Sequence, residues 1–353
     1  MAKFKCASFF AGVGGIDLGF EETGKFDVVY ANEFDSYPIK TYALNFPDTE
    51  VVEGDISKIE ASTVPDVDII FGGFPCQAFS IAGYRKGFDD EKGRGTLFFE
   101  MFRIIKEKQP KVVLAENVKN LLTHDGGNTY RVIKEALESE GYYVTERVLN
   151  AMSYGNVPQN RERIYIVAFK DKNAYDRFHF PNAVDLTTKL SDVIDFNNKV
   201  DEKYYYTKGK YKDEIYNAIV DGMDDENAVY QWRRRYVRKN KSGVVPTLTA
   251  NMGEGGHNVP LVKTKYGIRK LTPKECFNIQ GFPSDYQLPT DMSDSRLYKQ
   301  AGNSVCVSVI KAIAENIAIT LETDTHYCKN CGQSFEVQPD EKVEYCPFCG
   351  KQL

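Results

Sequence analysis

A short apolar run that ends in two glycines, a proline and a cysteine constrains this chain most. Residues 68–71 are typical of a buried strand, and the glycine pair 72–73 lets the backbone turn sharply after it. Pro75 fixes its own φ and restricts the residue before it. Cys76 is therefore expected on a stiff loop just past the carboxyl end of a strand, where open α/β sheets place their ligands. Most free cysteines are instead small buried hydrophobic residues. Other motifs in the chain are therefore needed to distinguish a functional Cys76 from a structural one.

Other strand ends upstream carry polar or glycine-rich residues. Residues 5–10 predict a strand that runs into the glycine-rich turn 11–15 and then a helix, an arrangement that cradles nucleotides. The turn does not match the dinucleotide fingerprint, because Asp17 stands where the third glycine would be. Glu33 ends the next apolar run, about 20 residues later, where such folds bind ribose hydroxyls. It could also be an ordinary solvent-exposed carboxylate. Asp55 ends the third run.

Alternation of strands and helices continues to about residue 180. A fifth strand, 112–115, brings Glu116 to the edge that carries Cys76, although a carboxylate there can be an ordinary strand-end group. Arg161 and Arg163 are two apart in an extended segment and so point to one face; a surface charge stripe is the plainer interpretation. The polar, glycine-rich residues 81–96 directly follow Cys76, which favours a lid.

Residues 181–265 are irregular, aromatic and patterned in charge, and predict a second, smaller domain. The net charge of −5 argues weakly against a nucleic-acid partner. A short basic run follows acidic residues, however, and a local positive patch can hold phosphates, although such runs are usually solvated faces. Downstream, residues 302–305 are expected to open a helix that packs back on the first domain. The candidate nucleic-acid contacts are Arg233, Arg234, Arg235, Arg238, Lys239, Lys241, Thr247 and Thr249.

The last residues hold two Cys-x-x-Cys-Gly motifs, one with Cys328 and Cys331 and the other with Cys346 and Cys349. Two such knuckles are typical of a structural zinc ion bound tetrahedrally by four thiolates, and unliganded or redox cysteines are the alternative. The N-terminus has no apolar signal region and no stretch has the uncharged length of a membrane span. A cytoplasmic protein that does not contact membranes is therefore expected.

These motifs, in this order, resemble the DNA (cytosine-5)-methyltransferases of the compact bacterial or phage type. The resemblance extends to about residue 322. It implies a doubly wound, mostly parallel α/β sheet in residues 1–180 that binds S-adenosylmethionine, a target-recognition domain in 181–265 and a return segment in 266–322. Residues 323–353 are an added zinc-ribbon-like module. The matching stretches are residues 10–15, 73–77, 116–118, 159–163, 247–248 and 302–305.

The resemblance also implies a cofactor site. Phe10 would lie against the adenine, Glu33 would hold the ribose hydroxyls, Phe34 would stack on the base and Asp55 would accept from the adenine amino group. The return segment would close the site. The other implied cofactor residues are Gly12, Gly14, Gly15, Ile56, Pro75, Asn303 and Val305.

The implied reaction explains the catalytic residues. Attack of the Cys76 thiolate on C6 makes C5 of cytosine nucleophilic, and Glu116 meets N3, where negative charge develops. Arg163 would hold O2, and Arg161 would support the site and the thiolate. The target cytosine must be flipped out of duplex DNA. A monomer working beside a cognate restriction endonuclease is expected. A catalytically silent DNA-binding relative and an RNA methyltransferase are the rival interpretations.

Overall fold

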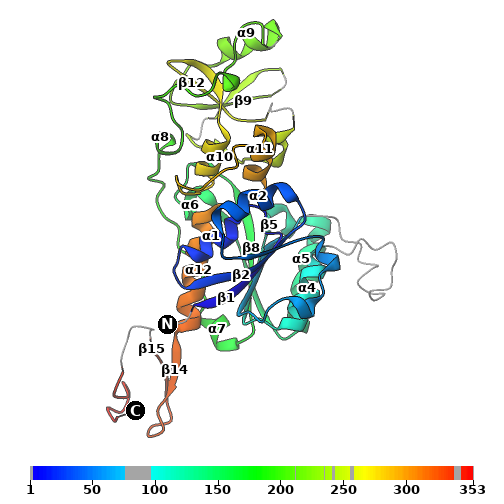
Figure 1. The fold of residues 1–353 in the computed structure, drawn as a ribbon. Coiled ribbons are helices and arrows are strands. Elements are labelled where there is room, and N and C mark those ends of the chain that lie inside the picture. The colour runs from blue at the N-terminus through cyan, green and yellow to red at the C-terminus, as the bar shows by residue number, and fades with distance from the viewer. Residues whose placement is uncertain are drawn as a thin grey trace.

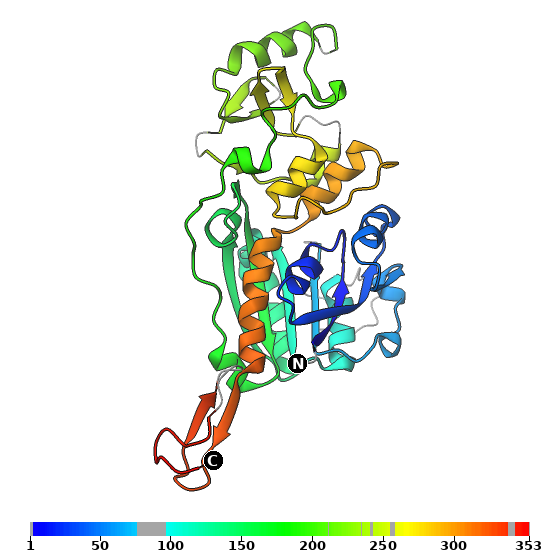
Figure 2. The same ribbon diagram turned by 60° about the vertical axis from the view of Figure 1, so that its left-hand side comes forward.

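The computed structural model describes residues 3–75, 97–210, 212–233, 235–240, 243–254, 258–337 and 343–352. The molecule is elongated and has three parts (Figure 1). A central α/β body lies between a smaller module and a hairpin. The module contains β9 (Val229–Trp232), β12 (Leu261–Thr264) and α9 (Asp213–Gly222), and the hairpin is formed by β14 (Asp324–Tyr327) and β15 (Ser334–Val337). Figure 2 shows the same three parts along one axis, with the hairpin at the end opposite the small module.

The body is built on a seven-stranded sheet with the order β3-β2-β1-β4-β5-β8-β6. Neighbouring strands from β3 to β5 are parallel, whereas β8 runs antiparallel to both of its neighbours, β5 and β6. The strands are β1 (Phe4–Phe9), β2 (Phe26–Glu33), β3 (Glu50–Glu53), β4 (Ile69–Gly73), β5 (Val112–Val118), β6 (Tyr143–Asn150) and β8 (Glu162–Phe169).

Helices cover both faces of this sheet because its central strands are apolar on both sides. In β4, Ile69 and Phe71 point into a core shared with α12, whereas Ile70 points into a core shared with α4. The prediction of a doubly wound, mostly parallel sheet is confirmed. The helices of the body are α1 (Gly15–Glu21), α2 (Ser36–Asn45), α4 (Leu97–Lys108), α5 (Asn128–Ser139), α6 (Ala151–Tyr154), α7 (Lys172–Arg177) and α12 (Val307–Glu322), with 3₁₀ turns η1 (Ile56–Lys58), η2 (Ala61–Thr63), η3 (Lys119–Leu122) and η4 (His124–Gly127).

The return of the chain to the body differs from the sequence-based expectation. Residues 302–305 do not open a helix: α11 (Asp294–Asn303) ends there, and α12 begins at Val307. Ser304 and Cys306 are extended, and the amide of Val307 donates to the carbonyl of Gln280 at 2.9 Å. The amide of Val307 therefore binds a carbonyl that is distant in sequence, instead of one in a helix beginning at residue 302. The apolar stretch Asp294–Glu322 has the length of a membrane-crossing helix, but 61% of its apolar window is buried, as in a soluble core helix.

The small module contains a four-stranded sheet with the order β10-β9-β12-β13. Its last strand lies beyond residue 265, and α10 and α11 lie between it and the body (Figure 2). A parallel pair of two-residue strands, β7 and β11, joins the module to the body. The elements are β7 (Gln159–Asn160), β9 (Val229–Trp232), β10 (Val237–Lys239), β11 (Val245–Pro246), β12 (Leu261–Thr264), β13 (Gly267–Lys270), α8 (Leu190–Val193), α9 (Asp213–Gly222), α10 (Pro273–Ile279), η5 (Glu202–Tyr204) and η6 (Ala250–Gly253).

The C-terminal hairpin follows α12 after a single residue, Thr323. Its strands are β14 (Asp324–Tyr327) and β15 (Ser334–Val337), which pair antiparallel. In both views the hairpin projects away from the body (Figures 1 and 2).

Candidate active site

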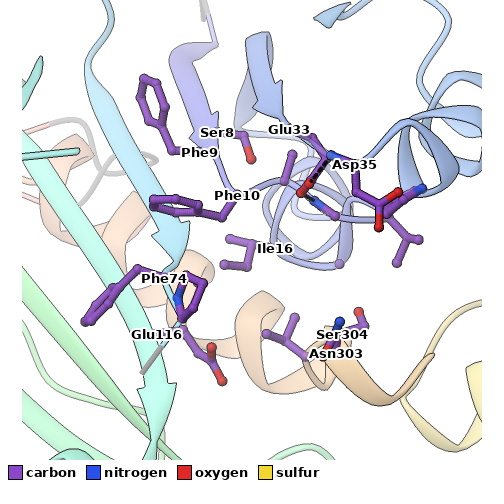
Figure 3. Close-up of a pocket in the computed structure, with 18 of the residues that line it drawn as sticks. Ser8, Phe9, Phe10, Ile16, Glu33, Asp35, Phe74, Glu116, Asn303 and Ser304 are labelled. Carbon is purple, nitrogen blue, oxygen red and sulfur yellow. Dashed lines mark hydrogen bonds between the residues drawn. The ribbon is translucent and has the colours of Figure 1, made fainter. Parts of the chain in front are cut away.

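A cavity of about 590 Å³ opens at the carboxyl ends of β1, β2, β4 and β5. This is where open parallel sheets hold their ligands. The wall combines the glycine turn, the ends of these strands and the part of the return segment that links α11 to α12 (Figure 3). Of the residues expected to bind the cofactor, these line the cavity: Phe10, Gly12, Gly15, Glu33, Phe34, Asp55, Ile56, Pro75, Asn303 and Val305.

Gly14 is absent from that wall and has a packing role instead. Its φ of 74° is left-handed, and a Cβ there would lie 2.3 Å from the Phe46 ring and 3.0 Å from the Tyr42 ring. The next residue, Gly15, faces the return segment, where a Cβ would lie 2.6 Å from Oγ of Ser304. The glycine turn can therefore fit between α2 and the return segment only without side chains.

Glu33 is buried at the end of β2 and is not a solvent-exposed carboxylate. Its Oε1 accepts from the amides of Phe34 and Asp35, both at 2.9 Å, and its Oε2 accepts from the amide of Gly12 at 2.9 Å (Figure 3). Burial raises the pKa of Glu33, against the lowering effect of these amides. The carboxylate thus holds the glycine turn against β2, while the Phe34 ring stays 72% exposed and available for stacking.

Glu116 and Arg163 form a partly shielded ion pair on adjacent strands. Nε of Arg163 lies 3.2 Å from Oε1 of Glu116, and the two side chains are 14% and 11% exposed. Burial raises the pKa of Glu116, and the charges of Arg163 and Arg161 oppose that shift. The end of β4 comes close, since a Cβ on Gly73 would lie 3.1 Å from Oε2 of Glu116.

Arg161 is buried and joins three segments of the chain. Its guanidinium donates to the carbonyl oxygens of Leu248 at 2.7 Å, Gly302 at 3.3 Å and Ser304 at 2.5 Å. Burial, and then the charge of Arg163, lower the pKa of Arg161 to about 10. The side chain therefore fixes the small module and the return segment to the end of the sheet.

Cys76 and the expected lid at 81–96 lie outside the described residues. The base of their loop is described. Asn117, next to Glu116 on β5, donates from Nδ2 to the carbonyl of Phe74 at 2.8 Å. The point at which the chain enters the cysteine loop is therefore fixed beside the Glu116 carboxylate.

The candidate DNA contacts are only partly accessible to phosphates. Arg234 and Lys241 lie outside the described residues. Lys239 pairs with Asp225 at 2.9 Å and with Asp224 at 3.3 Å, so its charge is largely neutralised within the module. The remaining described candidates are Arg233, Arg235 and Arg238, which are exposed, Thr247, whose hydroxyl donates to the carbonyl of Asn160, and Thr249, whose backbone lies against Gly302.

Several residues of the cavity wall were not singled out from the sequence as site residues. Lys299 lies one helical turn before Asn303 on α11, a spacing that could have indicated it. Ser304 follows Asn303, and its buried Oγ has no hydrogen-bond partner among the described residues. Asp17 departs from the nucleotide fingerprint, and this departure alone does not indicate a place in the cavity wall. The added wall residues include Ser8, Asp17, Arg296, Lys299, Gln300 and Ser304.

The four C-terminal cysteines form a compact group. Their sulfur atoms all lie within 4.8 Å of one another, with 3.7 Å between Cys328 and Cys349 and 3.6 Å between Cys331 and Cys346. A tetrahedral zinc ion with Zn–S bonds of about 2.3 Å separates its sulfur ligands by roughly 3.8 Å. The four thiol groups therefore fit a zinc ion.

Comparison with known proteins agrees with this geometry. The family of C-5 cytosine-specific DNA methylases matches residues 4–318. The chain is 57% identical to the Type II methyltransferase M.Bsp6I of Bacillus sp. (strain RFL6) over 311 residues, which cover 88% of this chain and 97% of that protein. It is 40% identical to the Type II methyltransferase M.HhaI of Haemophilus parahaemolyticus over 323 residues, 88% of this chain and 93% of that protein.

Solved structures support the fold. The DNMT2 mutant of Spodoptera frugiperda aligns with a TM-score of 0.68 at 22% identity, covering 89% of this chain and 99% of that chain. The S. pombe Dnmt2 methyltransferase aligns with a TM-score of 0.66 at 15% identity, covering 89% and 98%. Similarity at this level of identity describes the fold alone. Together with the family match over residues 4–318, it leads to one conclusion: the chain belongs to the C-5 cytosine-specific DNA methylase family.

Proposed function

We propose that this enzyme methylates C5 of a flipped-out cytosine in a specific duplex DNA sequence, through a transient bond between Cys76 and C6. The main support is the Glu116–Arg163 pair, which lies beside the anchored base of the cysteine loop and lines the cavity. An acid whose pKa is raised by burial and a fixed cation suit a ring that gains negative charge at N3 and O2.

The chemistry assigns a role to each residue. The Cys76 thiolate forms the S–C6 bond, and the ring electrons move towards C5 while Glu116 shares its proton with N3. When bound, S-adenosylmethionine would supply the electrophilic methyl group to C5 and would leave as S-adenosylhomocysteine. Loss of the C5 proton then expels the thiolate and restores the aromatic ring. Arg163 orients O2, and Arg161 acts as a positioning residue through the carbonyls it binds.

The residues present fit S-adenosylmethionine. Glu33 would accept from the ribose hydroxyls and Phe34 would stack on the adenine, with Asp55 at the amino group. The return segment, with Asn303 and Val305, would close the cavity. The unpartnered Oγ of Ser304 supports a polar ligand there, because a buried hydroxyl without a partner is costly.

The domain roles are part of the same proposal. Residues 1–180 with the return segment 266–322 form the catalytic domain, and 181–265 recognise the target sequence. Arg233, Arg235 and Arg238 are the exposed cations that would meet phosphates. The enzyme is a cytoplasmic monomer that protects DNA from a cognate Type II restriction endonuclease.

We also propose that Cys328, Cys331, Cys346 and Cys349 hold a structural zinc ion. The sulfur spacing supports it, as do the left-handed glycines Gly332 and Gly350, whose amides donate to the carbonyls of Cys328 and Cys346. Four thiolates leave no open coordination position, so the ion would have no catalytic role.

Two experiments test the enzymatic proposal. Bisulfite sequencing of DNA exposed to the enzyme should show protected cytosines within one recurring sequence. Duplex DNA with 5-fluorocytosine at that site should trap a covalent complex with the wild type and none with Cys76→Ala. Methylation by Cys76→Ala, or trapping at another residue, would contradict the assignment.

A further inference from the structure

Asp17 is a fully buried acid in the wall of the cofactor cavity for which the proposed reaction has no use. It lies on α1, directly after the glycine turn, and its side chain is 0% exposed. Oγ of Ser8 donates to its Oδ2 at 3.0 Å, and the phenol of Tyr42 donates to its Oδ1 at 2.8 Å. In the part of the chain that the structure describes, no lysine or arginine forms an ion pair with it.

These two hydrogen bonds connect the elements that shape the cavity. Ser8 belongs to β1, which ends at Phe9 and leads into Phe10, and its hydroxyl is directed into the cavity wall (Figure 3). Tyr42 belongs to α2 and lies directly beneath Gly14. Asp17 therefore sets the position of the glycine turn relative to β1 on one side and α2 on the other.

The surroundings of Asp17 favour its neutral form. Burial raises the pKa of Asp17 to about 7, and the hydroxyls of Tyr42 and Ser8 only partly oppose this shift. Other titratable groups that interact with the carboxylate are Glu21 on α1, Cys6 on β1 and Tyr286 in the return segment. None of these carries a positive charge that would hold Asp17 ionised.

We propose that Asp17 is a positioning residue whose ionised form holds the glycine turn in the geometry that binds S-adenosylmethionine. The ionised carboxylate accepts from both hydroxyls and has no hydrogen of its own to place. Protonation adds an O–H group that must donate to Ser8 or Tyr42, and the hydroxyl hydrogen of that residue then loses its present acceptor. Loss of one buried hydrogen bond weakens a site by about three- to tenfold in affinity. Affinity for the cofactor should therefore rise with pH through the neutral range. This inference rests on the proposed use of S-adenosylmethionine.

The test is calorimetric binding of S-adenosylmethionine and of its product S-adenosylhomocysteine between pH 6 and pH 8.5. Wild-type affinity for both should rise by about three- to tenfold. Asp17→Asn should remove this difference and bind at every pH about as the wild type does at the lowest. Any titration of the ligand itself is common to both proteins and cancels in the comparison. Glu21→Gln, on the same helix but outside the cavity, should keep the dependence, with its midpoint at slightly lower pH because a negative charge near Asp17 is removed.

Tyr42→Phe provides a second test if Asp17→Asn does not fold. It removes one donor to the carboxylate, so the midpoint of the affinity profile should move to higher pH. An unchanged midpoint, or a profile that persists in Asp17→Asn, would overturn the assignment. An effect on S-adenosylmethionine alone would also overturn it, because positioning must affect both ligands. Failure of the wild type to bind either ligand would instead contradict the proposed function.

Discussion

Nε of Arg163 lies 3.2 Å from Oε1 of Glu116, although the two residues are 47 positions apart and belong to antiparallel strands. The register of β5 and β8 places Val118 opposite Arg163, so the two side chains approach across the strand ends, where parallel neighbours also terminate. A base held there would meet an acid and a cation together.

Replacing Glu116 with Gln should abolish most methyl transfer. The amide has the same shape but cannot transfer a proton to N3, so the single-turnover rate should fall by about 10²- to 10⁴-fold. Because burial raises the pKa of Glu116 and the protonated form is active, the wild-type rate should decline as pH rises through that pKa. Calorimetric cofactor binding should be unchanged. Glu162→Gln, which changes an exposed carboxylate at the start of the neighbouring strand β8, should keep normal activity.

Loss of Arg161 should destabilise the whole enzyme. Arg161→Met leaves the carbonyls of Leu248, Gly302 and Ser304 without this donor, which should cost about 3 kcal/mol of unfolding free energy. Urea denaturation measures the difference. The exposed Arg131→Met, which breaks a surface pair with Glu135, should cost less than about 0.5 kcal/mol. Equal effects of the two substitutions would show that Arg161 does not join the segments.

Gly302→Ala should weaken the contact between the small module and α11. In a helix, alanine for glycine normally stabilises by about 1 kcal/mol. Here the added Cβ would lie 2.1 Å from the carbonyl carbon of Thr249 and 2.3 Å from its oxygen, and backbone cannot move aside cheaply. Lower thermal stability and weaker DNA binding are expected. Gly24→Ala meets no atom within 4 Å and should show only the strain of its left-handed φ.

Asp17→Asn should stabilise the fold above neutral pH even though it weakens cofactor binding. The folded-state pKa of about 7 lies above the ordinary value of 3.8, so the native state binds the proton more tightly than the unfolded chain. Unfolding free energy therefore falls as pH rises from about 4 to about 7 and is level above that. The amide removes this slope, and at pH 8 a gain on the order of 4 kcal/mol is expected. Thermal melts of both proteins at pH 5 and pH 8 measure it; a parallel pH dependence would be inconsistent with a raised pKa.

Removal of metal should melt the C-terminal module alone. Chelation, or Cys346→Ser, takes away thiolate ligands without which a module of this size has little core. The family match ends at residue 318, before the four cysteines. A chain truncated after Glu322 should therefore methylate DNA at the normal rate. Atomic emission should find about one zinc per intact chain, and a metal-free intact chain would contradict the ligand assignment.

Much of the fold could be predicted because the central strands are short, continuous apolar runs bounded by polar residues. Because Glu33, Asp55 and Glu116 each follow such a run, their position at one edge of the sheet can be predicted without knowing any tertiary contact. The strands of the small module are only two to four residues long, with the pattern hidden among charges, and this is why residues 181–265 looked irregular.

Other features depend on distant partners. The apolar spacing of Val305 and Val309 suggested a helix from residue 302, but the carbonyls there accept from Arg161, and Val307 donates to Gln280. Lys239 belonged to a basic run in sequence, yet it pairs with acids that precede it by 14 and 15 residues. Neither contact leaves a periodic signature in the chain.

The chain leaves the body at Thr323, directly after α12 and on the side away from the small module. A segment joined to the body at this point would lie far from the small module. A fluorescent reporter or an effector fused in place of the hairpin would therefore point away from the surface that is proposed to contact DNA. For the same reason, a different C-terminal module could replace the hairpin in a related chain without changes to the cavity or to the small module.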